Sequence, residues 1–182
     1  MADIRDQTGS WPVTESSVLA RGRIVTVRED RVRLPDGEVV GRELVEHPGA
    51  VAVVALDELD RVLLIRQYRH PVAATLWEIP AGLRDVHGEA LVETARRELA
   101  EETGLAAGSL RLLGVYDTPG RDPRGWTVSI AYLATVCAEA PVKGADDARD
   151  ARWFPTEDLP ELAFDHAAII DDALQRRAEC KR

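Results

Sequence analysis

Three glutamates, Glu98, Glu101 and Glu102, lie within five consecutive positions near the middle of the chain. At about 100° per residue, helical periodicity places all three on one side of a helix, beside an apolar stripe. That stripe consists of Leu91, Val92, Ala95 and Leu99. Carboxylates that crowd together and lose hydration repel one another unless a cation lies among them. Hard divalent ions prefer oxygen ligands, so the pattern favours a metal site.

A charged surface helix is the alternative reading of the same residues. Glu93 and Arg97 are four positions apart, which is the spacing of ion pairs on an exposed helix face. Two features favour a site instead. The acids flank the apolar stripe and do not oppose it, and Gly82 and Gly88 precede the helix, where glycine lets the backbone approach a ligand closely.

Composition limits the classes of function. The chain has 182 residues, enough for one domain with a real core, and its net charge of -9 argues against a broad nucleic-acid-binding surface. The two cysteines, Cys137 and Cys180, have no metal-type spacing and are too few for a disulfide scaffold. No apolar run has the length of a membrane span, and the first residues lack the apolar stretch of a signal peptide. We therefore expect a cytoplasmic protein with neither membrane nor nucleic-acid partners.

The first part of the chain predicts a small antiparallel β-unit, roughly residues 15–47. Strands are expected over residues 22–28, 31–34 and 38–46, with a turn at Pro35-Asp36-Gly37 before the last of them. A unit of this size has little to bury by itself, so it must pack on the main domain or on a second copy of the chain. We expect a division into residues 1–47 and 48–182.

Strands and helices interleave in the remaining sequence. Strands are expected over residues 50–56, 62–68, 77–82, 110–116, 128–136 and 151–154, and helices over residues 89–103 and 164–178. The last helix carries Ala167, Ile170 and Leu174 on one stripe, and Gly104 is a plausible stop for the first helix. The pattern indicates an α/β/α sandwich around a mixed β-sheet.

Residues 82–105 resemble the signature of the Nudix hydrolases. From Glu89 onward the match is complete: Glu89, seven residues, then Arg97-Glu98-Leu99, Glu101-Glu102 and Gly104-Leu105. Before Glu89 there is one departure, because six residues separate it from Gly82 where the signature has five. We expect a local bulge there, without loss of chemistry.

The resemblance implies roles for these positions. Glu98 and Glu102 would be direct ligands of Mg²⁺ or Mn²⁺, and Glu101 a ligand or a water-holding neighbour. The backbone carbonyl of Ala81 is a further metal ligand by the same resemblance, and a Glu89–Arg97 ion pair would fix the loop on the helix. Hydrolysis of a phosphoanhydride fits such a site, because the metal neutralises the phosphate charge and acidifies the attacking water.

The flanking sequence resembles the ADP-ribose pyrophosphatase branch of the family. The resemblance lies in residues 65–69, in residues 76–82 and in Pro119. It implies hydrolysis of ADP-ribose to AMP and ribose 5-phosphate, with Arg69 and Glu78 as substrate-binding residues. It also implies a homodimer in which the N-terminal β-unit is exchanged between subunits.

The last third resembles Nudix domains linked to nicotinamide-nucleotide metabolism, in residues 120–126, 146–154 and 162–166. By this resemblance Asp146 or Asp147 supplies the catalytic base or another metal ligand, although a solvated acidic loop is the alternative. Arg121 could contact a phosphate, since a planar guanidinium suits bidentate contact, or could be an ordinary loop charge. Trp77 could stack on a base, but packing is the favoured interpretation.

Three other functions stay open at this point. The chemistry could act on another nucleoside diphosphate sugar or on a dinucleotide polyphosphate. The chain could be a sensory module that binds ADP-ribose without cleaving it, or a structural domain that retains the motif. The complete set of three carboxylates favours the hydrolase, because a binding module has little need of all three.

Overall fold

The computed structural model describes residues 9–123, 127–137, 141–145 and 148–180. The chain divides into two compact units, Met1–Pro48 and Gly49–Arg182. Within the described residues, no helix combines the length and the apolar character needed to cross a membrane.

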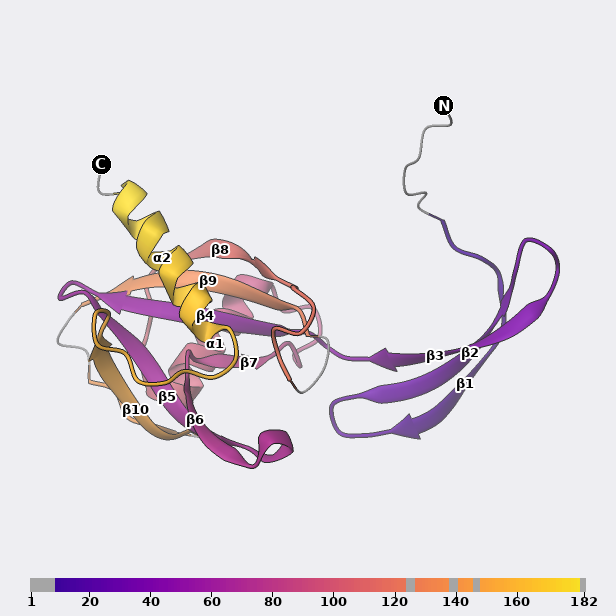
Figure 1. Cartoon of the computed structure of the whole chain (residues 1–182), viewed down its shortest axis with the longest axis horizontal. Helices are drawn as coiled ribbons and strands as arrows, with labels where there is room; N and C mark the ends of the chain where they lie inside the picture. Colours follow the sequence, from indigo (N-terminus) through magenta and orange to yellow (C-terminus); the bar gives the residue numbers. More distant parts are fainter. Residues whose placement is uncertain (1–8, 124–126, 138–140, 146–147, 181–182) are drawn as a thin grey trace. The chain divides into compact units, whose positions relative to one another are not determined.

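The first unit is a three-stranded antiparallel sheet in the order β1-β2-β3 (Figure 1). Its strands are β1 (Val13–Arg21), β2 (Thr26–Arg33) and β3 (Val39–Glu46). The expectation for the first half of this unit was wrong. The strand β1 was not expected, and the two strands expected over residues 22–28 and 31–34 are replaced by the one continuous strand β2.

Polar pairing explains that error. Asp30, in the middle of β2, is buried, and it accepts a hydrogen bond from Ser16 Oγ of β1 at 2.7 Å. Arg28 Nη2 lies 3.3 Å from its second carboxylate oxygen. These partners satisfy a charged residue inside the sheet, which an alternation pattern of apolar residues cannot reveal. Asp30 is also the only buried residue among those described in this unit, so the sheet has no apolar core of its own.

The second unit contains a seven-stranded mixed sheet in the order β10-β5-β4-β9-β8, with β6 paired to β5 and β7 paired to β4. Only β4 and β9 pair in parallel among these strands. The strands are β4 (Ala50–Asp57), β5 (Arg61–Arg69), β6 (Ala74–Glu78), β7 (Ala81–Leu83), β8 (Leu110–Tyr116), β9 (Ser129–Val136) and β10 (Ala148–Pro155). The helices are the short 3₁₀ helix η1 (His70–Val72), α1 (Leu91–Thr103) and α2 (His166–Cys180).

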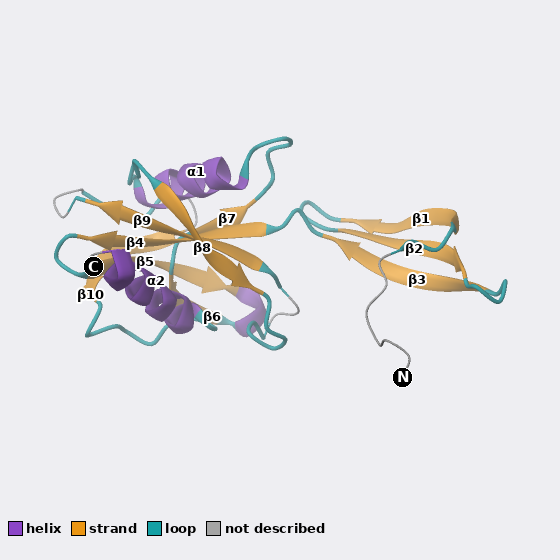
Figure 2. Ribbon diagram, turned by 90° about the horizontal axis from the view of Figure 1, so that it is seen from above, coloured by secondary structure: helices purple, strands orange, loops and turns teal. Residues whose placement is uncertain are grey.

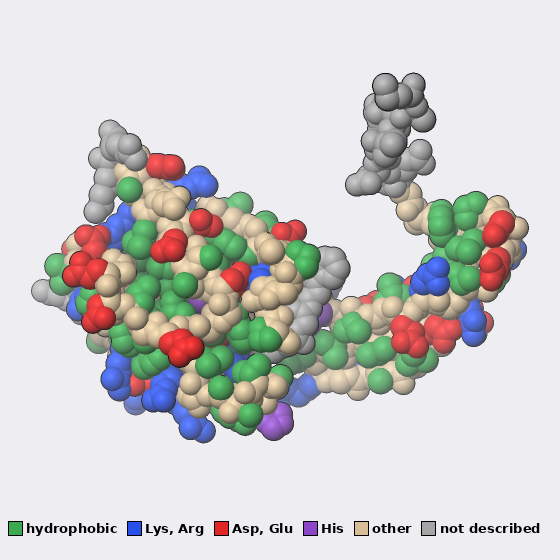
Figure 3. Space-filling model, in the orientation of Figure 1, with side chains coloured by type: hydrophobic (Ala, Val, Ile, Leu, Met, Phe, Trp, Pro, Cys, Tyr) green, Lys and Arg blue, Asp and Glu red, His purple; other side chains and the backbone are tan. Residues whose placement is uncertain are grey.

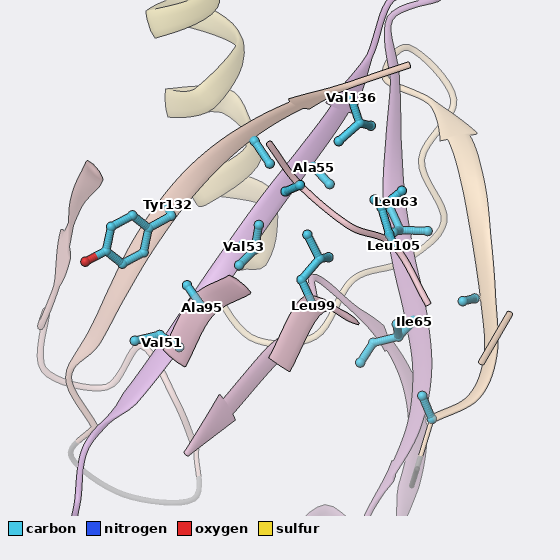
Figure 4. Close-up of a cluster of buried hydrophobic side chains, with 14 residues drawn as sticks. Val51, Val53, Ala55, Leu63, Ile65, Ala95, Leu99, Leu105, Tyr132 and Val136 are labelled. Carbon is cyan, nitrogen blue, oxygen red and sulfur yellow. The ribbon is translucent and has the colours of Figure 1, made fainter. Parts of the chain in front are cut away.

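The sheet separates two apolar cores. Alternate residues of the buried strand β4 point to opposite faces, so Val51 and Val53 belong to one core and Val54 to the other. The first core contains Ala95 and Leu99 of α1 (Figure 4), and the second contains Ile169, Ile170 and Ala173 of α2. Figure 2 shows the two helices on opposite sides of the sheet. The predicted α/β/α sandwich is therefore confirmed.

Two sequence-based expectations need adjustment within this unit. The extended segment expected over residues 77–82 is two strands, β6 and β7, separated at Pro80, which has no N–H to give to a ladder. On α2, Ile170 is buried but Ala167 is exposed. The buried stripe of α2 is therefore rotated relative to the expected one, since Ile169 and Ala173 face the sheet together with Ile170.

The chain before β10 is tied to the end of α1. Lys143 N–H donates to Thr103 O at 3.1 Å, and Ala145 N–H donates to Glu102 O at 3.0 Å. Between them, Gly144 is packed so tightly that a Cβ would lie 2.7 Å from Ala148 O and from Asp150 N. Both are backbone atoms, which cannot turn away as the end of a side chain could. This segment therefore requires glycine to reach the helix.

Replacing Gly144 with alanine should lower the free energy of unfolding by about 1–3 kcal/mol, because the added methyl group forces the backbone apart. Urea unfolding followed by circular dichroism measures this change. Gly108→Ala is the matched control: a Cβ there meets no atom within 4 Å, so stability should change by less than about 0.5 kcal/mol. Equal stability of the two variants would contradict the packing argument.

Candidate functional site

Helix α1 sets the positions of the acidic side chains. It begins at Leu91, two residues later than expected, because Ala90 is still extended with ψ of 143°. It ends at Gly104, where φ is 72° and the N–H donates to Ala100 O at 2.8 Å. The helix buries Ala95 and Leu99 against the sheet, and this packing fixes its rotation. Glu98 and Glu102, one turn apart, are thereby carried to the edge of the buried face.

The carboxylates of Glu98 and Glu102 both approach the backbone of β7. Glu102 is only 4% exposed, and its Oε2 accepts a hydrogen bond from Ala81 N–H at 3.1 Å. Glu98 lies against the next residue, since a Cβ built on Gly82 would be 1.9 Å from Glu98 Oε2. Gly82 thus leaves the space that the Glu98 side chain occupies. A turn closed by Glu89 N–H and Val86 O, at 3.2 Å, completes the connection to the helix.

Arg97 links the acids of this region into one network. Its Nη1 lies 2.7 Å from Glu98 Oε1 and 3.1 Å from Glu101 Oε2. Its Nη2 lies 3.1 Å from Glu89 Oε2 and 3.1 Å from Asp85 Oδ1. The expected Glu89–Arg97 ion pair is therefore present, but one guanidinium also serves three other carboxylates. A single cation is shared among four acids, so their negative charge is only partly compensated.

The surroundings change the acidity of these groups in opposite directions. Burial raises the pKa of Glu98, and the neighbouring Arg97 opposes that rise. The hydrogen bond from Arg97 lowers the pKa of Glu89, which also accepts a 2.9 Å bond from Thr94 Oγ1. Glu89 is thus held as an anion for structural use. Glu98 is a partly desolvated carboxylate whose charged form an additional cation would stabilise.

The donor chemistry fits a hard divalent ion. Glu98 and Glu102 supply carboxylate oxygens from one helix face, beside the Ala81–Gly82 backbone, and oxygen ligands are those that Mg²⁺ and Mn²⁺ take. Glu101 differs, because its side chain is 53% exposed and turned to Arg97. Over the residues that the structure describes, no three acidic, His or Cys side chains converge as a ligand group. The arrangement therefore offers two carboxylates next to a backbone segment, not a closed three-carboxylate cage.

The predicted substrate residues Arg69 and Glu78 form a bidentate pair across β5 and β6. Arg69 Nε donates to Glu78 Oε1 at 2.8 Å, and Arg69 Nη2 donates to Oε2 at 2.6 Å. Gln67 lies on the same face of the sheet as these two side chains. Gln67 is buried, and no partner for its Oε1 occurs among the described residues. Sequence reasoning missed it, although an amide within an apolar strand run was a visible signal.

Arg121 occupies a different position from the one expected of a phosphate contact. Its side chain is 6% exposed and forms a bidentate pair with Asp165, with both N···O distances at 2.7 Å. Its Nη1 also donates to Thr127 Oγ1 and to Ser129 Oγ, each at 3.1 Å. These bonds hold the loop after β8 against the start of α2, so a substrate contact by Arg121 stays a prediction.

The predicted acids Asp146 and Asp147 lie outside the described residues. The residues before them are placed: Ala145 N–H is bonded to the carbonyl oxygen of Glu102. The role of either aspartate stays a prediction.

Trp77 is a packing residue in this structure. Its ring meets that of Phe154 edge-on, with centroids 4.9 Å apart, and Arg66 and Arg152 lie over it at 5.9 and 5.8 Å. Figure 3 shows Lys and Arg side chains gathered at this edge of the larger unit, near β5 and β10. The favoured packing interpretation of Trp77 agrees with these contacts.

Comparison with known proteins gives the family. The NUDIX domain model matches residues 46–175, and the model of the nucleoside diphosphate sugar hydrolase N-terminal domain matches residues 11–45. The larger unit, an α/β/α sandwich with an acidic helix beside a glycine-containing strand, is thus a NUDIX domain. The chain belongs to the Nudix family.

Individual relatives carry related descriptions. The chain is 48% identical over 121 residues to an ADP-ribose pyrophosphatase of Mycobacterium tuberculosis, a match that covers 66% of this chain and 57% of that protein. It is 42% identical over 130 residues to an ADP-ribose pyrophosphatase of Methanocaldococcus jannaschii, covering 71% of this chain and 75% of that protein. The chain thus spans little more than half the length of the first relative.

A solved structure is also similar. The NUDIX domain of Shewanella oneidensis NrtR, complexed with ADP ribose, superposes with a TM-score of 0.64 at 32% identity. The match covers 70% of this chain and 86% of that one.

Replacing Gly82 with alanine should displace the Glu98 carboxylate while the fold persists, because the clashing atoms are the mobile end of a side chain. We expect Mn²⁺ affinity to fall about tenfold, the lower end of what loss of a supporting contact costs at a metal site. Titration of Mn²⁺ by electron paramagnetic resonance measures the affinity, and thermal unfolding checks the fold. Gly108→Ala is again the control, and wild-type Mn²⁺ affinity in folded Gly82→Ala protein would refute this account.

Proposed function

We propose that this protein hydrolyses the diphosphate of ADP-ribose, with Mg²⁺ or Mn²⁺, to AMP and ribose 5-phosphate. One observation carries the proposal: Glu98 and Glu102 present their carboxylates beside Ala81 and Gly82 in a Nudix chain that has ADP-ribose pyrophosphatases among its relatives. Glu102 is buried and Glu98 is partly buried, and two such carboxylates on one helix face are suited to hold a divalent ion.

The chain's own residues divide the work. Glu98 and Glu102 would hold the metal together with the carbonyl of Ala81, and Glu101 would hold a water or serve as a further ligand. When bound, the metal supplies a positive charge against the diphosphate and lowers the pKa of a coordinated water. Arg97 keeps Glu89 and Glu98 in place through its ion pairs with both. Asp146 or Asp147 is the candidate base that takes the proton of the attacking water.

Arg69 and Glu78 form the candidate substrate contact. Glu78 is almost completely buried, so its charge fixes the Arg69 guanidinium in one orientation. A fixed guanidinium can place its remaining donors toward phosphate or ribose oxygens. Substrate binding by Arg69 would then depend on Glu78 for orientation more than on direct contact by Glu78.

A second function has one specific observation in its favour. The similar Shewanella oneidensis domain was solved with ADP ribose, and that protein is also described in complex with DNA. A module that binds ADP-ribose without cleaving it would share the fold and the ligand. Hydrolysis of another nucleoside diphosphate sugar or of a dinucleotide polyphosphate is the remaining alternative.

Turnover of ADP-ribose distinguishes these functions. We expect AMP release with Mg²⁺ or Mn²⁺ and none with excess chelator. The Glu102→Gln variant should hydrolyse ADP-ribose more than about 10- to 100-fold more slowly than wild type, because that is the loss expected for a mere outer-shell partner. Glu93→Gln, on the exposed side of the same helix, should remain near wild type. Tight ADP-ribose binding without AMP would favour the sensory module. Much faster turnover of a different diphosphate in a substrate panel would change the substrate assignment.

We propose that the chain forms a homodimer through its N-terminal sheet. The three strands bury only Asp30 among the described residues of that unit, and exposed apolar side chains occur on β1 and β3. A sheet without a core gains stability only by covering such residues. Light scattering or sedimentation should give twice the 20.0 kDa chain mass. Deletion of residues 1–46 should convert the species to monomer, and a monomeric full-length chain would contradict the proposal.

A further inference from the structure

Residues 162–166, here called the strap, lead from the β10–α2 connection into α2 and run alongside the end of β6. Leu162 forms an isolated bridge with Trp77, and Ala163 N–H donates to Trp77 O at 2.9 Å. Phe164 adopts the left-handed region with φ of 54°, which is uncommon for a bulky residue. Such a conformation persists where the surroundings over-determine it, so the strap is held in a defined shape.

A second anchor holds the strap to the loop after β8. Asp165 receives two 2.7 Å hydrogen bonds from the buried guanidinium of Arg121. Bidentate arginine–carboxylate pairs fix orientation as well as distance. With Trp77 on one side and Arg121 on the other, the first residue of α2, His166, has little freedom to move.

His166 reaches from this strap to the segment between β6 and β7. Its imidazole is 7% exposed, and Nδ1 accepts a hydrogen bond from Ile79 N–H at 3.1 Å. A backbone N–H can only donate, so Nδ1 must be unprotonated in this arrangement. Ile79 is fully buried, and a buried N–H without an acceptor is costly, which makes this long-range bond an important constraint.

The segment that His166 holds continues directly into the candidate metal site. After Ile79, the carbonyl of Pro80 accepts a hydrogen bond from Val53 N–H at 2.9 Å. The N–H of Ala81 then donates to Glu102 Oε2 at 3.1 Å. Three successive residues are thus fixed by three different elements: Ile79 by α2, Pro80 by β4 and Ala81 by α1. The position of the Ala81 peptide relative to Glu102 depends on all three bonds.

We propose that His166 is a positioning residue for the metal site: through Ile79 N–H it fixes residues 79–81, and hence the Ala81 peptide, against Glu102. The proposal rests on the proposed function only in taking Glu98, Glu102 and Ala81 as the metal-binding groups. It assigns His166 no contact with metal or substrate. Its effect passes through the backbone from the opposite face of the sheet.

The test compares Mn²⁺ affinity, measured by electron paramagnetic resonance without substrate, with the kinetics of ADP-ribose hydrolysis. His166→Leu removes the acceptor, so Mn²⁺ affinity should fall about tenfold or more, as expected for an outer-shell partner. The Mg²⁺ concentration for half-maximal activity should rise by the same factor, while the KM for ADP-ribose at saturating Mg²⁺ stays within about twofold. His166→Asn keeps an acceptor near the Nδ1 position and should restore most of the affinity.

Tyr116→Phe is the matched control. It removes a 2.9 Å hydrogen bond from β8 to Asp172 of the same helix, away from residues 79–81, and should leave Mn²⁺ affinity unchanged. If His166→Leu does not fold, His166→Gln takes its place, since its acceptor lies one methylene farther from the backbone than that of Asn. The His166→Gln variant should then bind Mn²⁺ more weakly than the His166→Asn variant.

The possible outcomes distinguish failure of the positioning role of His166 from failure of the proposed hydrolysis of ADP-ribose. Wild-type Mn²⁺ affinity in a folded His166→Leu or His166→Gln variant would overturn it, and so would an equal loss in Tyr116→Phe. If the wild-type protein bound Mn²⁺ but did not cleave ADP-ribose, the proposed function would fail. A selective loss of affinity in His166→Leu would still support the positioning role.

Discussion

Two carboxylates pressed against a strand backbone are the constraint around which the larger unit is organised. Glu98 fills the space that a side chain at Gly82 would need, and Glu102 accepts the N–H of Ala81. Both glutamates are largely withdrawn from water, where like charges repel strongly. Helix α1 can keep them there because Ala95 and Leu99 fix its rotation from the apolar side. The packing of the core thus dictates where the charge is held.

Arg97 makes this arrangement tolerable without neutralising it. One guanidinium contacts Glu89, Glu98, Glu101 and Asp85, so the region keeps an excess of negative charge. Withdrawing the Glu98 and Glu102 carboxylates from water on one helix face costs stability, which indicates that these two acids serve something other than stability. A divalent ion would use the excess, and the Nudix family to which the chain belongs is consistent with that use.

The opposite face of the sheet contributes to the same site indirectly. Helix α2 lies on the face of the sheet away from α1, yet the first residue of α2, His166, fixes Ile79, two residues before Ala81. The strap that carries His166 is in turn fixed by Arg121, which sequence reasoning assigned to substrate. Residues that look like surface charges in the sequence can therefore be structural connections between layers. The Arg121–Asp165 pair and the His166–Ile79 hydrogen bond therefore contribute both to the stability of the fold and to the geometry of the site.

The N-terminal sheet shows how far local patterns reach. The turn at residues 35–37 and the strand after it follow from proline and glycine conformations and from β-branched residues, which act locally. The apolar residues of β1 do not alternate regularly with polar ones, and the strand was missed because it is held by pairing with β2 and by the Ser16–Asp30 hydrogen bond. Such strand pairing is a tertiary interaction, and a periodicity argument contains no information about it.

The sequence by itself determined the helix with its acids, the glycine that ends it and the resemblance to one family. It also determined the order of strands and helices in the second unit, apart from the division into β6 and β7. These follow from residue periodicity, turn chemistry and a long motif with fixed spacing. Only the tertiary structure decided that Arg69 pairs with Glu78 and that Arg121 is buried on Asp165. It also decided that Gln67 is buried and that His166 reaches Ile79. The physical reason is distance along the chain: an arginine or histidine has the same local signature whether it meets a ligand or a partner 44 or 87 residues away.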